Sequence, residues 1–320
     1  AVLNTLLLSD HCDLVLAVAG SSAQFQPEVA IEPLIEATTH GKPLASFAAP
    51  HAETSLKLLA DAGIAGFRTP ESCADAIRAW RDWVPPIEQP SADTQRLNAA
   101  RALIADSGSQ LDEYRSCLVF EALGVARATT QVIKTAEQST TVPFPVVAKI
   151  LSPDILHKTD AGGVVLNIAD AQALKSNARD ILARVRRKYP DARIEGILVQ
   201  RMEKGIAELI LGYKRDPQVG PVVVLGVGGV LAEIYHDFAV RLAPVSVEHA
   251  HAMIDEVKGL AVIRGYRGMP KGDLEALAHA VSAFSQIAHL DGVAEAEINP
   301  LMVKREGEGV VAVDGLIVRK

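Results

Sequence analysis

Residues 144–168 read FPVVAKILSPDILHKTDAGGVVLNI, and this stretch decides how the chain is interpreted. An apolar strand pattern contains Lys149, and a loop with Gly162 and Gly163 leads into a second apolar strand. A lysine meets phosphate as a point charge, and paired glycines let the backbone approach a phosphate closely and offer N–H donors. The stretch therefore predicts a phosphate-handling site, although the GxxxxGK[ST] loop is absent. The alternative is a β-hairpin whose glycines serve only the turn.

A glycine-rich turn follows the next long apolar strand pattern, over residues 221–226. The turn reads GVGG at residues 226–229, and Glu233 follows it. Such a turn after a buried strand is often found at nucleotide sites, but a tight chain connection explains a single GxGG as well. The motif alone therefore leaves both interpretations open.

A set of oxygen ligands is predicted near the C-terminus. Residues 297–301 read EINPL, and Asp314 follows Asn299 by fifteen positions in VVAVDG. Side chains alternate along a strand, so Glu297 and Asn299 are expected on one face, with Asp314 on a partner strand. Asn and Asp oxygens suit Mg²⁺, which also binds substrate phosphates. Turn chemistry at Asn-Pro is the alternative for this set.

Residues 1–83 are predicted as a partial α/β unit. Short strand patterns over residues 14–19, 43–48 and 64–68 alternate with helix patterns, which is the βαβ rhythm of a parallel sheet. Parallel sheets commonly have about four to six strands. Since the chain also lacks an initiator Met, we expect it to continue a longer polypeptide.

A linker and a second unit are predicted after it. Residues 84–110 contain three prolines and a polar stretch, a composition typical of a connection between domains. Residues 111–320 mix strands and helices without strict alternation, which favours an α+β fold. Within this unit, the apolar patterns over residues 197–201 and 207–213 are predicted as paired strands.

The composition excludes several protein classes. Hydrophobic residues make up 49% and charged residues 22%, with a mean hydropathy of +0.18, so the chain is not wholly disordered. The net charge is −7 and no basic stripe is visible, which argues against a nucleic-acid partner. No apolar run approaches the roughly 20 residues of a membrane span. Three scattered cysteines without a CxxC pair argue against a zinc site and fit the reducing cytoplasm.

Taken in order, these motifs resemble the ATP-grasp module of the nucleoside-diphosphate-forming acyl-CoA synthetases, relatives of succinyl-CoA synthetase. The similar phrases also include GILVQRM, ELILGYKRDPQVGPVVVLGVGG and IRGYRG, and they cover about residues 111–320. Residues 1–83 resemble the later part of that family's ligase subdomain, through KPLASFAAP and LLADAGIAGFRTPE. The resemblance implies a partial flavodoxin-like α/β domain with a parallel sheet, followed by an α+β ATP-grasp domain.

The resemblance also implies roles for individual residues. Lys149 would contact ATP phosphates, with Gly162 and Gly163 as the glycine loop, and Asn299 and Asp314 would hold Mg²⁺. The remaining residues of the implied nucleotide site are Lys158, Gln200, Arg201, Met202 and Glu208, of which residues 200–202 would read adenine through their backbone.

Two further residues are implied as catalytic. Glu297 matches an acid that steadies a phosphohistidine. His157 matches a position that archaeal relatives use as a second phosphate carrier. A loop histidine that hydrogen-bonds to the backbone and positions Lys158 is the alternative for His157.

The implied reaction is ATP + carboxylic acid + CoA ⇌ ADP + phosphate + acyl-CoA, with CoA as a substrate of the complete enzyme. The family's main phosphohistidine motif and its CoA-binding domain are not found in this sequence, so they are expected in cis or in trans. A homo-oligomer is a further option. Two alternatives stay open: a regulatory nucleotide- or acyl-CoA-sensing module, as in fusions to lysine acetyltransferases, and an ATP-grasp carboxylate–amine ligase.

Overall fold

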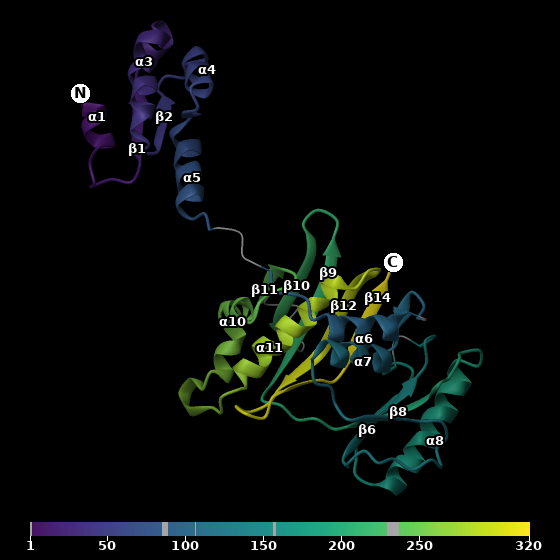
Figure 1. Cartoon of the computed structure of the whole chain (residues 1–320). Coiled ribbons are helices and arrows are strands. Elements are labelled where there is room, and N and C mark those ends of the chain that lie inside the picture. The colour runs from purple at the N-terminus through teal and green to yellow at the C-terminus, as the bar shows by residue number, and fades with distance from the viewer. Residues whose placement is uncertain (1, 85–88, 106, 156–157, 229–236) are drawn as a thin grey trace. The chain divides into compact units, whose positions relative to one another are not determined.

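The computed structural model describes residues 2–84, 89–105, 107–155, 158–228 and 237–320. The chain divides into two compact units, which we call unit 1 (Ala1–Ile87) and unit 2 (Glu88–Lys320). Each unit is described by itself (Figure 1).

Unit 1 holds a three-stranded parallel sheet in the order β1-β2-β3, as the βαβ rhythm predicts. A small core of Ile31, Leu34, Leu59 and Ile64 joins the helices to the sheet. Thr69 caps the last helix as its side chain accepts a hydrogen bond from the Ser72 N–H at 3.2 Å. The elements are β1 (Val15–Ala19), β2 (Leu44–Ala48), β3 (Ala65–Phe67), α1 (Val2–Leu7), α2 (Ser22–Phe25), α3 (Pro27–Ala37), α4 (Glu53–Asp61) and α5 (Pro70–Arg81).

Among the described residues, unit 2 forms two sheets. The large sheet has seven strands in the order β11-β10-β9-β12-β14-β4, with β13 paired to β12. The small sheet has four strands in the order β5-β8-β6-β7. The large-sheet strands are β4 (Gln110–Leu111), β9 (Ala207–Asp216), β10 (Gly220–Val227), β11 (Phe238–Leu242), β12 (Val293–Val303), β13 (Val310–Ala312) and β14 (Gly315–Arg319). The small-sheet strands are β5 (Thr130–Ile133), β6 (Val146–Leu151), β7 (Val164–Ile168) and β8 (Gly196–Arg201).

Helices bury one face of each sheet. The large core packs α6 (Thr94–Ile104), α7 (Glu113–Leu123), α10 (Val247–Glu256) and α11 (Leu274–Ser285) against the large sheet. Within it, the rings of Phe120 and Phe284 lie 5.3 Å apart. The small core packs α8 (Ala171–Lys188) against β6 and β8. Alternate residues of β9, among them Glu208, are not part of this core. They lie on the opposite face of the large sheet, because side chains alternate along a strand.

The predicted pairing of residues 197–201 with residues 207–213 is wrong. The first segment is β8 of the small sheet, and the second begins β9, which pairs with β10 and β12 in the large sheet. The chain between them crosses from one sheet to the other: the Met202 N–H donates to Pro145 O, and the Ile206 N–H donates to Val303 O. Neighbouring strand patterns do not reveal such a crossing, because each strand takes its partners from distant segments.

The interval 84–110, predicted as a linker from its composition, contains α6. Leu97, Ala100 and Ile104 of this helix are buried in the large core of unit 2. The sequence of α6 is polar overall, so the one helix face that carries its apolar residues was not recognised. A single buried face is enough to hold a helix against a sheet. In the described part of the chain, no helix is long and apolar enough to cross a bilayer.

Candidate functional site

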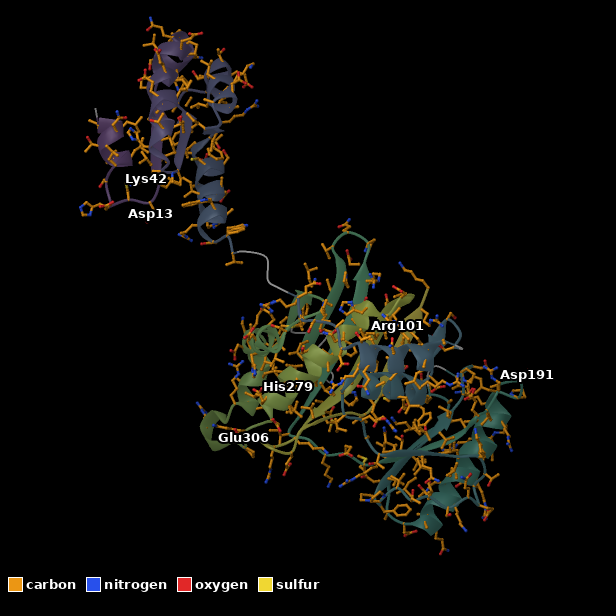
Figure 2. All side chains as sticks on the ribbon, in the orientation of Figure 1. Asp13, Lys42, Arg101, Asp191, His279 and Glu306 are labelled. Carbon is orange, nitrogen blue, oxygen red and sulfur yellow. The ribbon has the colours of Figure 1, made fainter. Side chains whose placement is uncertain are left out.

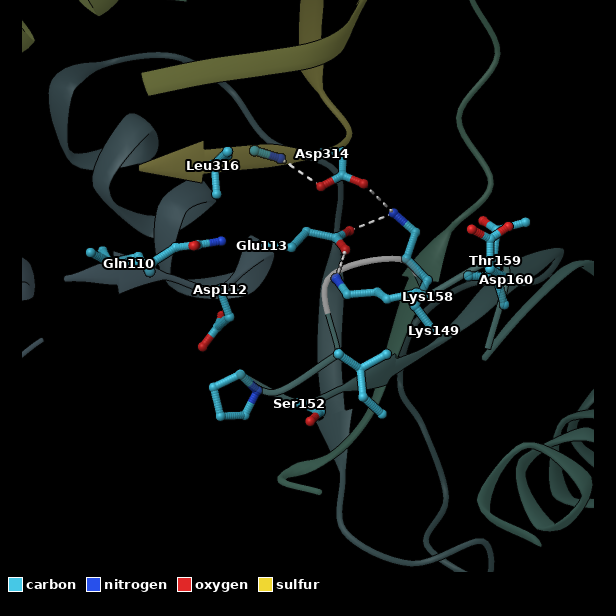
Figure 3. Close-up of a pocket in the computed structure, with 15 residues that line it drawn as sticks. Gln110, Asp112, Glu113, Lys149, Ser152, Lys158, Thr159, Asp160, Asp314 and Leu316 are labelled. Atoms are coloured by element: carbon cyan, nitrogen blue, oxygen red, sulfur yellow. Dashed lines mark hydrogen bonds and ion pairs between the residues drawn. The ribbon is translucent and has the colours of Figure 1, made fainter. Parts of the chain in front are cut away.

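A cavity of about 740 Å³ lies where the small-sheet and large-sheet parts of unit 2 meet (Figure 3). The small-sheet part lines it with β6, the start of β7 and the loop that joins them. The large-sheet part lines it with the start of α7 and the connection from β13 to β14. The polar residues of the lining are Gln110, Asp112, Glu113, Lys149, Ser152, Lys158, Thr159, Asp160 and Asp314.

The first residue of α7 brings a carboxylate into this cavity. Asp112 is the N-cap of α7, and its side chain accepts a hydrogen bond from the Arg115 N–H at 2.8 Å. The cap fixes where the helix begins and therefore which residue follows it at the cavity wall. The Glu113 side chain is only 2% exposed. A carboxylate so deeply buried needs cationic partners.

Two lysines from the small-sheet part supply these partners (Figure 3). The Lys149 ammonium donates a hydrogen bond to Glu113 Oε1, and Lys158 Nζ donates to Glu113 Oε2 at 2.6 Å. Lys149 Nζ also lies 3.5 Å from Asp314 Oδ2. We call these four residues the ion network. Surface charges such as Arg101, Asp191 and Glu306 lie on the outside of unit 2 instead (Figure 2).

The network fixes the charge of its members. Burial by itself would lower the pKa of Lys149, but the charges of Glu113 and Asp314 outweigh burial and raise that pKa above its ordinary value. Lys149 therefore stays an ammonium at neutral pH. Burial raises the pKa of Asp314, with Glu113 adding to the effect and Lys149 opposing it. The network thus holds an ammonium group that stays charged, beside a carboxyl group whose ionised form is disfavoured by burial.

Gly162 and Gly163 close the loop after Lys158. The Gly162 N–H donates to Thr159 O at 2.9 Å, and the Gly163 N–H donates to Lys158 O at 2.8 Å. A Cβ on Gly163 would lie 2.5 Å from Ile150 Cγ2, so only glycine fits there. Both N–H groups serve the loop itself, as the hairpin alternative proposes, and a phosphate contact through them stays a prediction.

Gln200 at the end of β8 joins the two sheets. Its side chain is buried, and Nε2 donates to Val313 O at 2.7 Å, next to Asp314. Its Oε1 is buried without a hydrogen-bond partner in the structure. The N–H groups of Arg201 and Met202 donate to Thr129 O and Pro145 O, both at 2.9 Å. The predicted adenine contact of this segment would therefore involve its carbonyl groups or the residues that follow.

Glu297 and Asn299 share one face of β12, as the alternation predicts. Asn299 Nδ2 donates to Glu297 Oε1 at 3.0 Å, and the Asn299 N–H donates to Asp314 O at 3.3 Å. The three residues are neighbours, but the Asp314 carboxylate turns to Lys149.

The donor chemistry of this group fits Mg²⁺. Asp314 lines the cavity with a hard carboxylate oxygen beside two ammonium groups, whereas Asn299 is not among the lining residues and contacts Asp314 through its N–H. In the described residues, no group of three or more His, Cys, Asp or Glu side chains is arranged to hold a metal by itself. Mg²⁺ does not need such a group, because it usually keeps waters and shares its coordination with substrate phosphates.

The remaining predicted residues lie apart from the ion network or outside the described residues. Glu208 pairs with Met302 across β9 and β12, and its carbonyl accepts from the Gly228 N–H at 2.7 Å. A Cβ on Gly228 would lie 2.9 Å from that carbonyl oxygen, so this glycine serves the close approach of two chains. His157, Gly229 and Glu233 lie outside the described residues.

Sequence reasoning missed Glu113, the central carboxylate of the network. It lies 36 positions before Lys149 and 45 before Lys158, and no local motif links such distant residues. The one available signal was a charged residue directly after a helix cap, at the start of an otherwise largely apolar helix.

A family model and several known proteins are similar to this chain. A family model described as an ATP-grasp domain matches residues 102–318. The chain is 33% identical over 273 residues to ADP-forming acetate–CoA ligase I of Archaeoglobus fulgidus, covering 81% of this chain and 40% of that ligase. It is 34% identical over 235 residues to the beta subunit of ADP-forming acetate–CoA ligase II of Pyrococcus furiosus, covering 71% of this chain and 98% of that subunit.

The chain is also similar to solved structures of the dinucleotide-forming acetyl-coenzyme A synthetase 1 of Candidatus Korarchaeum cryptofilum. In the complex with coenzyme A, Ca-AMPCP and HgCl⁺, the TM-score is 0.65 at 35% identity, over 69% of this chain and 100% of that one. In the complex with coenzyme A and Mg-AMPPCP, the phosphohistidine segment points towards the nucleotide binding site. For this structure the TM-score is 0.61 at 31% identity, over 69% of this chain and 100% of that one.

Proposed function

The chain belongs to the ATP-grasp family, with ADP-forming acyl-CoA ligases among its relatives, and from this we propose that unit 2 binds Mg·ATP or Mg·ADP in the cavity. It would carry out the phosphoryl-transfer step of ATP + carboxylic acid + CoA ⇌ ADP + phosphate + acyl-CoA. The observation that carries this proposal is the ion network, which gathers two ammonium groups and a hard carboxylate around one cavity. Phosphoryl transfer is catalysed mainly by positioning and charge neutralisation, and these groups provide both.

Each side chain has a distinct task in this proposal. Lys149, charged and buried, would turn from Asp314 to the nucleotide phosphates. Lys158 would neutralise the phosphoryl group as it leaves the nucleotide. Asn299 and Asp314 would hold Mg²⁺, which would supply positive charge to offset that of the phosphates. The lysines orient the phosphates, and the buried walls of β6 and α7 keep water from competing for them.

We propose that His157 is a second phosphate carrier, in addition to the main phosphohistidine of the complete enzyme. It directly precedes Lys158, which lines the cavity. A neutral imidazole is a nucleophile at neutral pH, and the ammonium groups nearby would stabilise the phosphorylated product. Incubation with γ-labelled ATP and Mg²⁺, followed by mapping of acid-labile label, tests this role. Label on His157 that disappears in His157→Ala supports it, and a protein that binds ATP normally without taking up label contradicts it.

The complete reaction requires more than this chain provides. The chain spans 40% of the length of the Archaeoglobus ligase, and it aligns with nearly all of the Pyrococcus beta subunit. We infer that a further region or subunit supplies the CoA site and the main phosphohistidine. The reported relatives carry the names of ligases, so the comparisons give no support to the regulatory alternative.

Titration calorimetry with Mg·ATP and Mg·ADP tests nucleotide binding directly. We expect binding by the wild-type chain and its loss in a variant that combines Lys149→Ala, Asn299→Ala and Asp314→Ala. A matched control combines Lys175→Ala with Glu137→Ala, which removes an exposed ion pair away from the cavity. Equal affinity in the cavity variant and the wild type would show that the nucleotide binds elsewhere.

A further inference from the structure

The cavity that is proposed to take a nucleotide is formally acidic. Its described ionisable lining consists of two cations, Lys149 and Lys158, and four anions, Asp112, Glu113, Asp160 and Asp314. The sum of these formal charges is +2 − 4 = −2. The two lysines therefore do not make this a general anion site, and a polyphosphate that enters it meets a net negative wall.

Glu113 stands apart from the other three acids. Both of its oxygens accept hydrogen bonds from ammonium groups, and its side chain is only 2% exposed. Its charge is therefore poorly screened by water. Asp160 is exposed, Asp112 is occupied as a helix cap, and Asp314 is a proposed metal ligand. Both oxygens of Glu113 accept hydrogen bonds from the lysines, so it acts on a ligand through its charge rather than by binding a metal.

We infer that Glu113 is a specificity-determining residue that makes the cavity accept metal-complexed nucleotide and reject metal-free nucleotide. This inference rests on the proposed function and adds a role that the ligand set does not explain. By offsetting one of the two positive charges of Lys149 and Lys158, Glu113 leaves the acidic cavity with too little positive charge for a free polyphosphate. A nucleotide that carries Mg²⁺ brings the missing positive charge with it.

Coulomb interactions at these distances are large enough for such selection. At an effective dielectric constant of about 20, one charge roughly 12 Å from a ligand changes an affinity about tenfold for each unit of ligand charge, and a nearer charge changes it more. Metal-free ADP is more negative than Mg·ADP by the charge of the ion. Removing the Glu113 charge should therefore favour metal-free ADP much more than Mg·ADP.

This reasoning predicts a gain of binding, which structural damage does not produce. Calorimetry would measure the affinity for ADP with Mg²⁺ and for ADP with EDTA, in the wild type and in Glu113→Gln. We expect the wild type to bind ADP in EDTA at least about 100-fold more weakly than Mg·ADP, and Glu113→Gln to narrow this ratio by about 100-fold, because the two forms of ADP differ by two charges. Glu121→Gln is the matched control, because Glu121 lies on the same helix and pairs with Arg127 at 2.8 Å.

A second variant keeps the inference testable if Glu113→Gln does not fold. Asp160→Asn removes an exposed charge of the same lining, and we expect a smaller gain of about two- to threefold for ADP in EDTA. If neither variant narrows the ratio between the two affinities, Glu113 is only a structural partner of the lysines. A wild type that binds both forms of ADP equally overturns this inference alone, whereas a wild type that binds no Mg·ADP overturns the proposed function.

Discussion

The small-sheet and large-sheet parts of unit 2 bring opposite charges to one cavity. The small-sheet part contributes the ammonium groups of Lys149 and Lys158, and the large-sheet part contributes the carboxylates of Glu113 and Asp314. The groups proposed to bind phosphate thus lie on one side, and the carboxylate proposed to bind the metal lies on the other. Without a ligand, the two sides neutralise each other through ion pairs that span the cavity.

Because of this division, a ligand must replace the ion-pair partners of the charged groups on both sides of the cavity. A phosphate that takes Lys149 leaves Asp314 without its cation, and a metal that takes Asp314 leaves Lys149 with fewer partners. Breaking a buried pair by removing one member is costly, because the other charge stays behind. Variants that remove one side at a time are therefore the direct way to test the division.

The largest effect is expected for Lys149→Ala, which removes the buried cation of the small-sheet side. Hydrogen bonds to charged groups are the strong ones, and the variant also leaves Glu113 and Asp314 facing the phosphates, so we expect Mg·ADP affinity to fall about 100-fold. Calorimetry measures it. Lys175→Ala, on an exposed side chain of α8, is the control and should bind like the wild type. An affinity for Lys149→Ala within twofold of the wild type would contradict the division.

Removing the large-sheet oxygens should have a smaller and different effect. In the double variant Asn299→Ala with Asp314→Asn, we expect the Mg²⁺ concentration needed for half-maximal ADP binding to rise about tenfold. Binding of ADP in EDTA should not fall, because the cations of the small-sheet side are intact. Equal losses with and without Mg²⁺ would show that these residues contact the nucleotide rather than the metal.

The comparison also shows which parts of the site sequence can reveal. Lys149 lies in β6, whose apolar pattern is local, so its strand could be predicted. Glu297 and Asn299 share a face for the same reason, and their hydrogen bond confirms it. Asp314 was expected on a strand, but it lies in the connection between β13 and β14. The parallel sheet of unit 1 followed from its alternating strands and helices.

Other features depend on distant contacts and could not be predicted. Glu113 meets Lys149 only after α7 packs on the large sheet and β6 is in place, and no short pattern encodes that meeting. The strands β8 and β9 are neighbours in sequence, yet they belong to different sheets because each finds its partners elsewhere. The glycine N–H groups were predicted to offer donors to a phosphate, with a purely structural turn as the alternative, and in the structure the loop uses them in its own hydrogen bonds.

A third prediction concerns the stability of the unliganded protein. Burial raises the pKa of Asp314, so the folded state holds this proton more tightly than the unfolded state does. The stability contribution is fully present below the unfolded pKa and is lost as the pH rises through the folded pKa. At neutral pH, Asp314→Asn should therefore be no less stable than the wild type. Since the side chain is 41% exposed, solvent screening keeps the gain below about 1 kcal/mol.

Thermal unfolding of unliganded protein at pH 7.5 and near pH 4 would measure this effect. We expect the Asn variant to unfold at the same or a slightly higher temperature at pH 7.5, and the difference to shrink towards pH 4 as Asp314 takes up its proton. A variant that unfolds several degrees below the wild type at pH 7.5 would show that the Asp314 carboxylate stabilises the fold. The ion pairs between the two sides would then serve stability rather than ligand binding.

The smallest effect is expected at Cys117, which lies beneath the cavity on α7. Burial, together with the charges of Glu113 and Asp314 and against the opposing charge of Lys149, raises the pKa of this thiol to about 12. At pH 8 only about 10⁻⁴ of the thiol would be thiolate, the form that reacts. Iodoacetamide followed by mass spectrometry should therefore label the partly exposed Cys12 and leave Cys117 unmodified. Lys149→Ala should not change this, because it removes only an opposing charge, and denatured protein shows that the thiol can be labelled. Rapid labelling of native Cys117 would mean that Lys149, rather than burial and the two acids, has the larger effect on the pKa of this thiol.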